Sequence, residues 1–291
     1  MKILVIGSQG QLGNEFQAIQ SSSSHDFSFV DQDNLNITKE AEVQNYIQKA
    51  SFDVVINCAA YTAVDDAEED EDLAFAVNEK AVKHLVNACI KHRMKLIHFS
   101  TDYVFDGQHH KPYTEKDKVK PLGVYGKSKR AGEEVILKSN VSSLILRTSW
   151  LYSHYGQNFM KSMIRLGRER EQLQIVFDQV GTPTHARDLA QATLTCLDQH
   201  KIWENQQKLY HFSNEGVSSW FDFAKAIFDK EHIDCRVQPI LSKEYPTKAQ
   251  RPHYSVLDKS QFKSDFKVEI PHWLDSFRNY YQESLTTAKI L

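Results

Sequence analysis

The sequence predicts an α/β protein built on a doubly wound parallel sheet with helices on both faces. Two features of the 291-residue chain predict this fold class. Short apolar runs alternate regularly with longer amphipathic segments through the first half, which favours parallel strands joined by helices. These apolar runs are continuous, as in strands that are buried on both faces. After about residue 150 the alternation loosens, and we expect a smaller carboxyl-terminal lobe there.

The individual elements can be assigned in order along the chain. The predicted strands are Ile3–Ile6, Phe27–Val30, Val54–Ile56, Leu96–Phe99 and Leu144–Leu146. The predicted helices cover residues 11–20, 38–50, 70–93, 122–138, 157–170, 186–199 and 218–230. The helix 70–93 is the clearest, because Leu73, Val77 and Ala81 recur on one helical face. Prolines punctuate the tail of the chain, so we expect mostly loops with short elements there.

Composition excludes several classes of protein. Hydrophobic residues make up 41% and charged residues 25% of the chain, which is ordinary for a globular protein and unlike disordered, collagen-like or coiled-coil chains. A net charge of −3 gives no electrostatic basis for binding nucleic acid or an anionic membrane. No apolar run approaches the roughly 18 residues of a membrane span. The start of the chain lacks a signal-like segment and the cysteines lie far apart, so we expect a cytoplasmic protein with reduced thiols.

A glycine pattern follows the first predicted strand and leads into the first predicted helix. Gly7, Gly10 and Gly13 stand at three-residue spacing there. Such glycines allow a tight turn, the approach of backbone to a pyrophosphate, and close packing of helix on strand. The helix N-terminus offers free N–H groups to the phosphates. The pattern predicts a Rossmann-type dinucleotide site.

The expected cofactor follows from this motif and the acid that comes after it. Asp31 ends the second predicted strand, where a carboxylate accepts from the ribose 2′-hydroxyl of NAD and repels the 2′-phosphate of NADP. We therefore expect NADPH or NADH, with a slight preference for NADH.

Residues 1–150 are predicted to form the dinucleotide-binding domain, with part of 171–212 returning to it. Residues 151–291 are predicted to form mainly a substrate lobe.

A second motif supplies an acid for catalysis. Tyr125 and Lys129 are four residues apart in the predicted helix 122–138, so they lie on one face. A lysine ammonium beside a phenol lowers the pKa of that phenol from its usual value near 10. Ser100 and Thr101 end the fourth predicted strand, at the sheet edge where ligands bind. A hydroxyl there can hydrogen-bond a substrate carbonyl that Tyr125 protonates.

The glycine pattern, the Ser100-Thr101 pair and the Tyr125-x-x-x-Lys129 motif together resemble the extended short-chain dehydrogenase/reductase superfamily. Within it, the chain is similar to the dTDP-4-dehydrorhamnose reductases. The resemblance covers almost the whole chain, including the carboxyl-terminal lobe. The stretches that carry it are residues 10–13, 57–65, 100–105, 121–126, 147–150, 178–184, 210–212, 245–247 and 251–255.

The resemblance implies reduction of dTDP-4-dehydro-L-rhamnose to dTDP-L-rhamnose, with a role for each matching residue. Tyr125 would protonate the sugar C4 oxygen, Lys129 would hold the nicotinamide ribose, and Thr101 would supply the hydroxyl. With the glycines and Asp31, the residues assigned to the cofactor are Gly7, Gly10, Gln11, Leu12, Gly13, Asp31, Asn36, Ile37, Ala59, Ala60, Tyr61, Tyr103, Tyr125 and Lys129. The residues assigned to the nucleotide-sugar substrate are Thr101, Asp102, Tyr125, Trp150 and Arg251, the last near the diphosphate.

The sequence departs from the family pattern at several positions. Some relatives carry an acid, thought to help bind magnesium at a dimer interface, where this chain has Arg187, although Glu15 is present. We therefore expect no metal and leave a homodimer open. Asn36 replaces an aspartate, and Tyr254 replaces an asparagine. The acidic segment 65–72 is interpreted as a solvated helix start.

Two other functions stay open on the sequence. One is a reductase of another nucleotide-4-keto sugar, or an epimerase of the same fold, because these enzymes share the motif residues. The other is a regulatory subunit that binds a dinucleotide without catalysis. The intact set of Thr101, Tyr125 and Lys129 argues against the regulatory subunit, because a binding module has no need of a proton donor.

Overall fold

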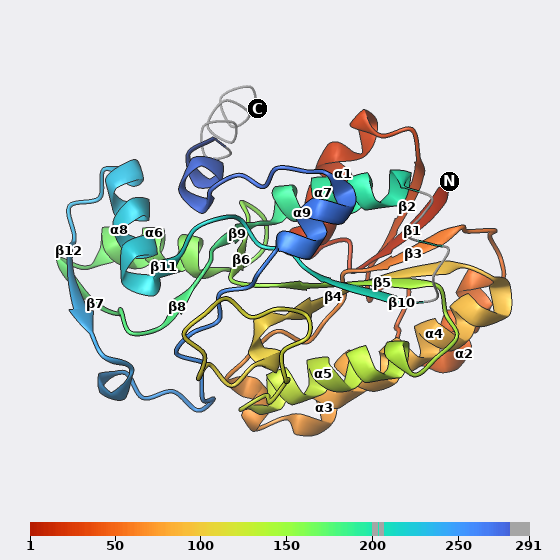
Figure 1. The fold of residues 1–291 in the computed structure, drawn as a ribbon, viewed down its shortest axis with the longest axis horizontal. Helices are drawn as coiled ribbons and strands as arrows, with labels where there is room; N and C mark the ends of the chain where they lie inside the picture. Colours follow the sequence, from red (N-terminus) through yellow and green to blue (C-terminus); the bar gives the residue numbers. More distant parts are fainter. Residues whose placement is uncertain (200–202, 204–206, 280–291) are drawn as a thin grey trace.

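The computed structural model describes residues 1–199, 203 and 207–279. A six-stranded sheet with the strand order β10-β5-β4-β3-β1-β2 forms its centre (Figure 1). Each neighbouring pair in this sheet is parallel, which confirms the predicted Rossmann-type fold. The strands are β1 (Lys2–Ile6), β2 (Asp26–Val30), β3 (Val54–Asn57), β4 (Lys95–Thr101), β5 (Ser143–Thr148) and β10 (Gln207–His211).

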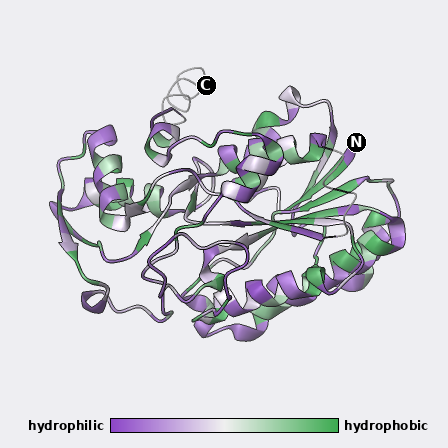
Figure 2. Cartoon of the chain, in the orientation of Figure 1, coloured by the Kyte–Doolittle hydropathy of each residue, from purple (hydrophilic) through white to green (hydrophobic). Residues whose placement is uncertain are grey.

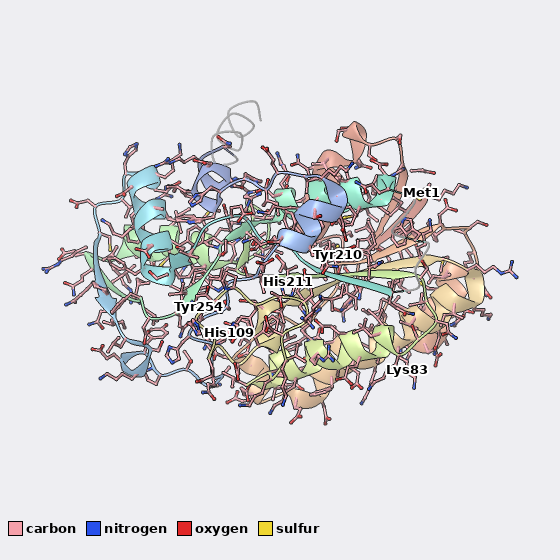
Figure 3. The ribbon with its side chains drawn as sticks, in the orientation of Figure 1. Met1, Lys83, His109, Tyr210, His211 and Tyr254 are labelled. Carbon is pink, nitrogen blue, oxygen red and sulfur yellow. The ribbon has the colours of Figure 1, made fainter. Side chains whose placement is uncertain are left out.

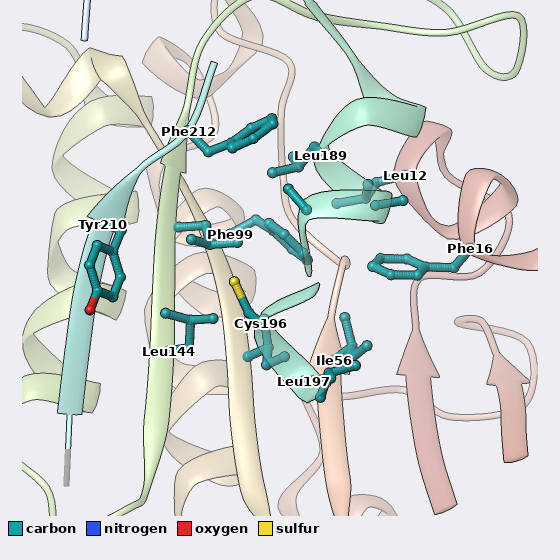
Figure 4. Packing of buried hydrophobic residues seen from close by; sticks show 14 of the residues in the cluster. Leu12, Phe16, Ile56, Phe99, Leu144, Leu189, Cys196, Leu197, Tyr210 and Phe212 are labelled. Atoms are coloured by element: carbon teal, nitrogen blue, oxygen red, sulfur yellow. The ribbon is translucent and has the colours of Figure 1, made fainter. Parts of the chain in front are cut away.

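Helices cover both faces of this sheet because successive side chains of each strand point to opposite faces. Ile3 and Val5 of β1 pack in one apolar cluster with α1 (Gln11–Ile19), α7 (Ala186–Asp198) and α9 (Ser260–Phe266). Figure 4 shows Leu12, Phe16 and Leu189 of this cluster against the strands.

The alternate residues of β1 face the other layer of helices. Leu4 and Ile6 pack with residues of α2 (Glu40–Ile47), α4 (Ala81–His92) and α5 (Val124–Leu137). β1, β3 and β5 are buried along almost their whole length, whereas the helices around the sheet show both hydrophilic and hydrophobic residues in Figure 2. Burial on both faces explains why the apolar runs of the sequence are unbroken.

The predicted helix 70–93 is present in the structure and contains a π-helical turn. It consists of α3 (Glu71–Phe75), a π-helical turn (Ala76–Lys80) and α4. The π turn places Asn78 so that its side chain accepts from the Tyr61 backbone N–H at 2.9 Å and donates to the Tyr61 carbonyl at 3.0 Å. Asn78 also donates to the Ser128 hydroxyl at 3.0 Å. The predicted helix is therefore confirmed, and its π turn ties the loop after β3 to α5.

A second lobe has its own apolar core. It contains α6 (Phe159–Glu169), α8 (Trp220–Glu231) and a parallel pair of strands, β7 (Gln172–Val176) and β12 (Arg236–Ile240). Short two-residue strands connect the lobes. They are β6 (Leu151–Tyr152), β8 (Val180–Gly181), β9 (Thr184–His185) and β11 (Ser218–Ser219). Within the described ranges, no helix is long and apolar enough to cross a bilayer.

Candidate active site

A cavity of about 1250 Å³ opens at the carboxyl edge of the central sheet. The end of β4, the first turn of α1 and the start of α5 line one side, and α6, β7 and Trp220 of α8 line the other. Doubly wound sheets bind their ligands at this edge. The volume exceeds the roughly 300–1,000 Å³ of an ordinary small-molecule pocket. The cavity can therefore accommodate more than one small ligand.

The glycine loop brings the N-terminus of α1 to this cavity. Gly7 has a φ of +79°, and a Cβ there would lie 2.6 Å from the Ala59 backbone nitrogen. A Cβ on Gly13 would lie 2.3 Å from the Gly7 carbonyl oxygen. The N-cap residue, Gly10, provides no side-chain cap, and the first turn of α1 has no acidic residue. This helix terminus suits an anionic group such as a pyrophosphate.

The predicted cofactor contacts separate into two groups. The residues that line the cavity are Gly10, Gln11, Leu12, Ala60, Tyr103, Tyr125 and Lys129. The residues that do not line it are Gly7, Gly13, Asp31, Asn36, Ile37, Ala59 and Tyr61. Gly7 and Gly13 instead let the glycine loop pack closely against neighbouring backbone, which a Cβ at either position would clash with. Ile37 is buried in the core beside α2 and α4.

Asp31 is fixed against the glycine loop at the end of β2. Its carboxylate accepts from the backbone N–H groups of Gln9 and Gln32, each at 2.8 Å. The neighbouring Asn36 accepts from the Thr38 backbone and hydroxyl at 3.0 and 2.7 Å. Asp31 is therefore held in one orientation next to the predicted pyrophosphate site.

Thr101, Asp102, Tyr125 and Lys129 come together in the cavity wall. Thr101 ends β4, and its hydroxyl accepts from the Tyr103 backbone N–H at 3.2 Å and donates to Asp102 at 3.1 Å. Tyr125 lies in the first turn of α5. Lys129 Nζ donates to the Phe99 carbonyl at 2.7 Å. Thr101, Asp102 and Lys129 are buried and Tyr125 is half-buried, so electrostatic interactions among them are weakly screened.

The ionisation of this cluster differs from the prediction. Burial raises the pKa of Tyr125 to about 12, and the nearby Thr101 hydroxyl opposes that rise only in part. Burial lowers the pKa of Lys129 to about 8. A lowering of the Tyr125 pKa by Lys129 was therefore the wrong prediction for the free chain, because burial dominates and the ammonium is turned to Phe99. The phenol stays protonated at neutral pH, as a proton donor must.

Trp150 and Arg251 both line the cavity. The Trp150 ring stacks on Trp220 with centroids 3.5 Å apart and planes 5° apart. Arg251 forms a bidentate pair with Asp65, at 2.6 and 3.1 Å. Asp65 also accepts from the Ala249 backbone N–H at 3.0 Å. The interpretation of Asp65 as part of a solvated helix start was wrong, since it joins the loop after β3 to the loop that carries Arg251.

Sequence reasoning missed a loop that closes over the glycine turn. Gly156, Gln157 and Asn158 line the cavity beside the N-terminus of α1. Asn158 donates to the Gln11 side chain at 2.9 Å and caps α6 by accepting from the Lys161 backbone at 3.1 Å. An asparagine directly before a predicted helix is the signal that could have identified this position.

The structure shows the contacts of Arg187 and Tyr254, two positions that depart from the family pattern. Arg187 Nε lies 2.9 Å from a carboxylate oxygen of buried Glu15, which also accepts from Ser153 at 2.6 Å. No cluster of potential metal ligands occurs in the part of the chain that the structure describes. Tyr254, labelled in Figure 3, does not line the cavity and packs against the apolar group around Tyr113.

A model of the family described as the RmlD substrate binding domain matches residues 1–286. The chain is 38% identical over 287 residues to a dTDP-4-dehydrorhamnose reductase of Aggregatibacter actinomycetemcomitans, with 96% of this chain and 97% of the relative covered. A crystal structure of a dTDP-4-dehydrorhamnose reductase from Clostridium acetobutylicum superposes with a TM-score of 0.92 at 39% identity, covering 98% of this chain and 100% of the other.

A further crystal structure shows the dTDP-4-dehydrorhamnose reductase of Bacillus anthracis in complex with NADP. It has a TM-score of 0.90 at 36% identity and covers 97% of this chain and 99% of the other. These matches extend over both lobes and confirm the resemblance predicted from the sequence. The chain therefore belongs to the dTDP-4-dehydrorhamnose reductase family of NAD(P)H-dependent oxidoreductases.

Proposed function

We propose that the protein reduces dTDP-4-dehydro-L-rhamnose to dTDP-L-rhamnose with NADPH or NADH. The observation that carries this proposal is the meeting of Thr101, Tyr125 and Lys129 in a cavity that also receives the uncapped N-terminus of α1. The first three residues can activate a carbonyl, and the helix terminus can hold a dinucleotide beside it. Membership of a reductase family supports the substrate.

The residues of the chain divide the work between binding and proton transfer. The first turn of α1 binds the pyrophosphate of the cofactor, and Lys129 holds its nicotinamide ribose. The bound cofactor supplies the hydride. Tyr125 gives a proton to the C4 oxygen of the sugar, which contributes about 10²–10⁴-fold to such reactions. Trp150 packs on the sugar, and Arg251 attracts the diphosphate.

The direct test follows reduced-nicotinamide absorbance after dTDP-4-dehydro-L-rhamnose is added to the purified protein. We expect absorbance to fall as dTDP-L-rhamnose forms, with NADH and NADPH assayed separately. A protein that binds either dinucleotide saturably but oxidises neither would refute the proposal and favour another sugar or a regulatory role. Tightly held NAD that is never consumed would favour an epimerase.

The orientation of Asp31 leads to a prediction about cofactor choice. Asp31→Asn should raise the ratio of kcat/KM for NADPH over that for NADH by roughly tenfold, equivalent to about 1.4 kcal/mol. The reason is that the carboxylate repels a 2′-phosphate at the end of β2, while an asparagine oxygen can still accept from the Gln9 N–H. Asp33→Asn, on the same exposed loop, is the matched control. Equal ratios in the two variants would place the ribose elsewhere.

A further inference from the structure

The loop between β6 and α6, residues 153–158, packs against the first two turns of α1. Ser153 donates to a carboxylate oxygen of buried Glu15 at 2.6 Å. Gly156 has a φ of +63°, and a Cβ there would lie 3.0 Å from Cγ of Gln11. The loop therefore joins the start of α6, in the second lobe, to the helix terminus that suits a pyrophosphate.

Asn158 ends this loop, and its amide group gives the link to α1 a direction. The side-chain oxygen accepts from the Lys161 backbone N–H at 3.1 Å, so the amide nitrogen is the atom that faces α1. That nitrogen donates to Gln11 Oε1 at 2.9 Å and to the Ser153 carbonyl at 2.6 Å. Gln11 must present its oxygen to Asn158, which leaves its own amide nitrogen for an acceptor in the cavity that it lines.

A pyrophosphate at the N-terminus of α1 supplies such an acceptor. Gln11 is the first residue of this helix, where backbone N–H groups and the helix dipole favour an anion. A phosphate oxygen that accepts from the Gln11 amide nitrogen fixes the side chain in the orientation that also accepts from Asn158. Hydrogen bonds in such a chain strengthen one another. An anion on α1 therefore tightens the contact that holds the start of α6.

The start of α6 carries this contact into the other half of the cavity. Phe159 follows Asn158 and lines the cavity, and its ring centroid lies 4.6 Å from that of Trp220. Trp220 in turn stacks on Trp150 with centroids 3.5 Å apart. Trp150 has a φ of +45°, a strained backbone conformation for a bulky residue, which the residues around it must hold. The position of the Trp150 ring therefore depends on where α6 begins.

We propose that Asn158 is a positioning residue that couples the two binding steps of the reaction. A dinucleotide on α1 raises the affinity of the cavity for the sugar nucleotide, and the sugar nucleotide raises the affinity for the dinucleotide by the same factor. This inference rests on the proposed function. Because one hydrogen bond carries the link, we expect a coupling of roughly fivefold, at the lower end of the range for coupled sites.

The test measures the dissociation constant of NADPH by fluorescence titration, with and without saturating dTDP-L-rhamnose. Both ligands are already reduced, so no turnover occurs and the titration reports binding alone. In the wild type, the sugar nucleotide should tighten NADPH binding roughly fivefold. Asn158→Ser should bring this ratio to about 1, because serine still caps α6 but is too short to reach Gln11. Asn14→Ser is the matched control and should keep the wild-type ratio, since Asn14 donates only within α1, to the Gly10 carbonyl at 2.9 Å.

A second variant tests the same contact from the α1 side. Gln11→Met keeps the length of the side chain and the backbone N–H but has no acceptor for Asn158, so it should also bring the ratio to about 1. The double variant should show no further change, because both substitutions remove the same bond.

Three results would overturn the coupling. One is a wild-type ratio near 1, and another is a wild-type ratio in Gln11→Met. The third is an Asn158→Ser protein that binds NADPH more weakly by the same factor with and without the sugar nucleotide, which is the effect of a merely structural residue. If Asn158→Ser fails to fold, Gln11→Met decides. A wild-type protein that binds NADPH but not dTDP-L-rhamnose would overturn the proposed function, and the coupling with it.

Discussion

Replacing Tyr125 by phenylalanine should lower kcat by about 10²–10⁴-fold and leave cofactor binding intact. The ring would still fill its site against Tyr103, which it meets edge-on with centroids 5.6 Å apart. The variant lacks only the phenolic hydroxyl group. Since that proton neutralises the charge that develops on the sugar oxygen, its loss acts on the transition state.

The measurement is steady-state reduction together with titration of the reduced dinucleotide by fluorescence. Tyr113→Phe is the matched control, because it removes a buried phenol that bonds Asp106 at 3.1 Å outside the cavity. Turnover near the wild-type value in Tyr125→Phe would remove Tyr125 as the proton donor. Loss of dinucleotide binding in that variant would show that the phenol serves the cofactor instead.

The sheet was predictable because its central strands are apolar without interruption. β1, β3 and β5 are buried on both faces, and their runs stand out in the sequence. β10 has the sequence Gln-Lys-Leu-Tyr-His at the edge of the sheet and gives no such run. β12 contains Pro239, which an edge strand tolerates. Both strands depend on tertiary pairing rather than on a local pattern.

The sequence predicted which residues meet in the site better than it predicted their ionisation. Tyr125 and Lys129 share a helix, and Thr101 ends a strand, so spacing alone brings them to one edge. The ionisation of Tyr125 depends on burial and on the orientation of Lys129 toward Phe99, which no spacing encodes. The pairing of Arg251 with Asp65 joins residues that are 186 positions apart, so only the fold reveals it.

An ion pair between Glu133 and Arg147, buried beneath the site, should contribute strongly to the stability of the lobe that contains the central sheet. Glu133, one turn after Lys129 on α5, accepts from Arg147 of β5 at 2.7 and 2.8 Å. Glu133 is 0% exposed and Arg147 is 2% exposed. His211, labelled in Figure 3, contacts Arg147, but burial lowers the pKa of His211 to about 3 and leaves it neutral.

Glu133→Ala should therefore lower the free energy of unfolding by about 3–5 kcal/mol, because it leaves the Arg147 guanidinium buried without its counterion. Urea unfolding at pH 7 measures this loss. Glu134→Ala is the matched control, since Glu134 is the next residue on α5 and its ion pairs are at the surface. That variant should lose no more than about 1 kcal/mol. Similar losses in the two variants would contradict the role of the buried pair.

The same pair fixes the sign of the pH dependence of stability. Burial acts to raise the pKa of Glu133, but the hydrogen bonds and charge of Arg147 outweigh it and hold the pKa below its usual value. A lowered folded-state pKa stabilises the protein fully above the pKa of an unfolded glutamate, about 4.3, and the stabilisation disappears as pH falls through the folded-state value. Glu133→Leu combined with Arg147→Met removes both charges and should recover most of the stability at pH 7. Because the double variant has no ion pair to titrate, it should also lose less stability in acid than the wild type does.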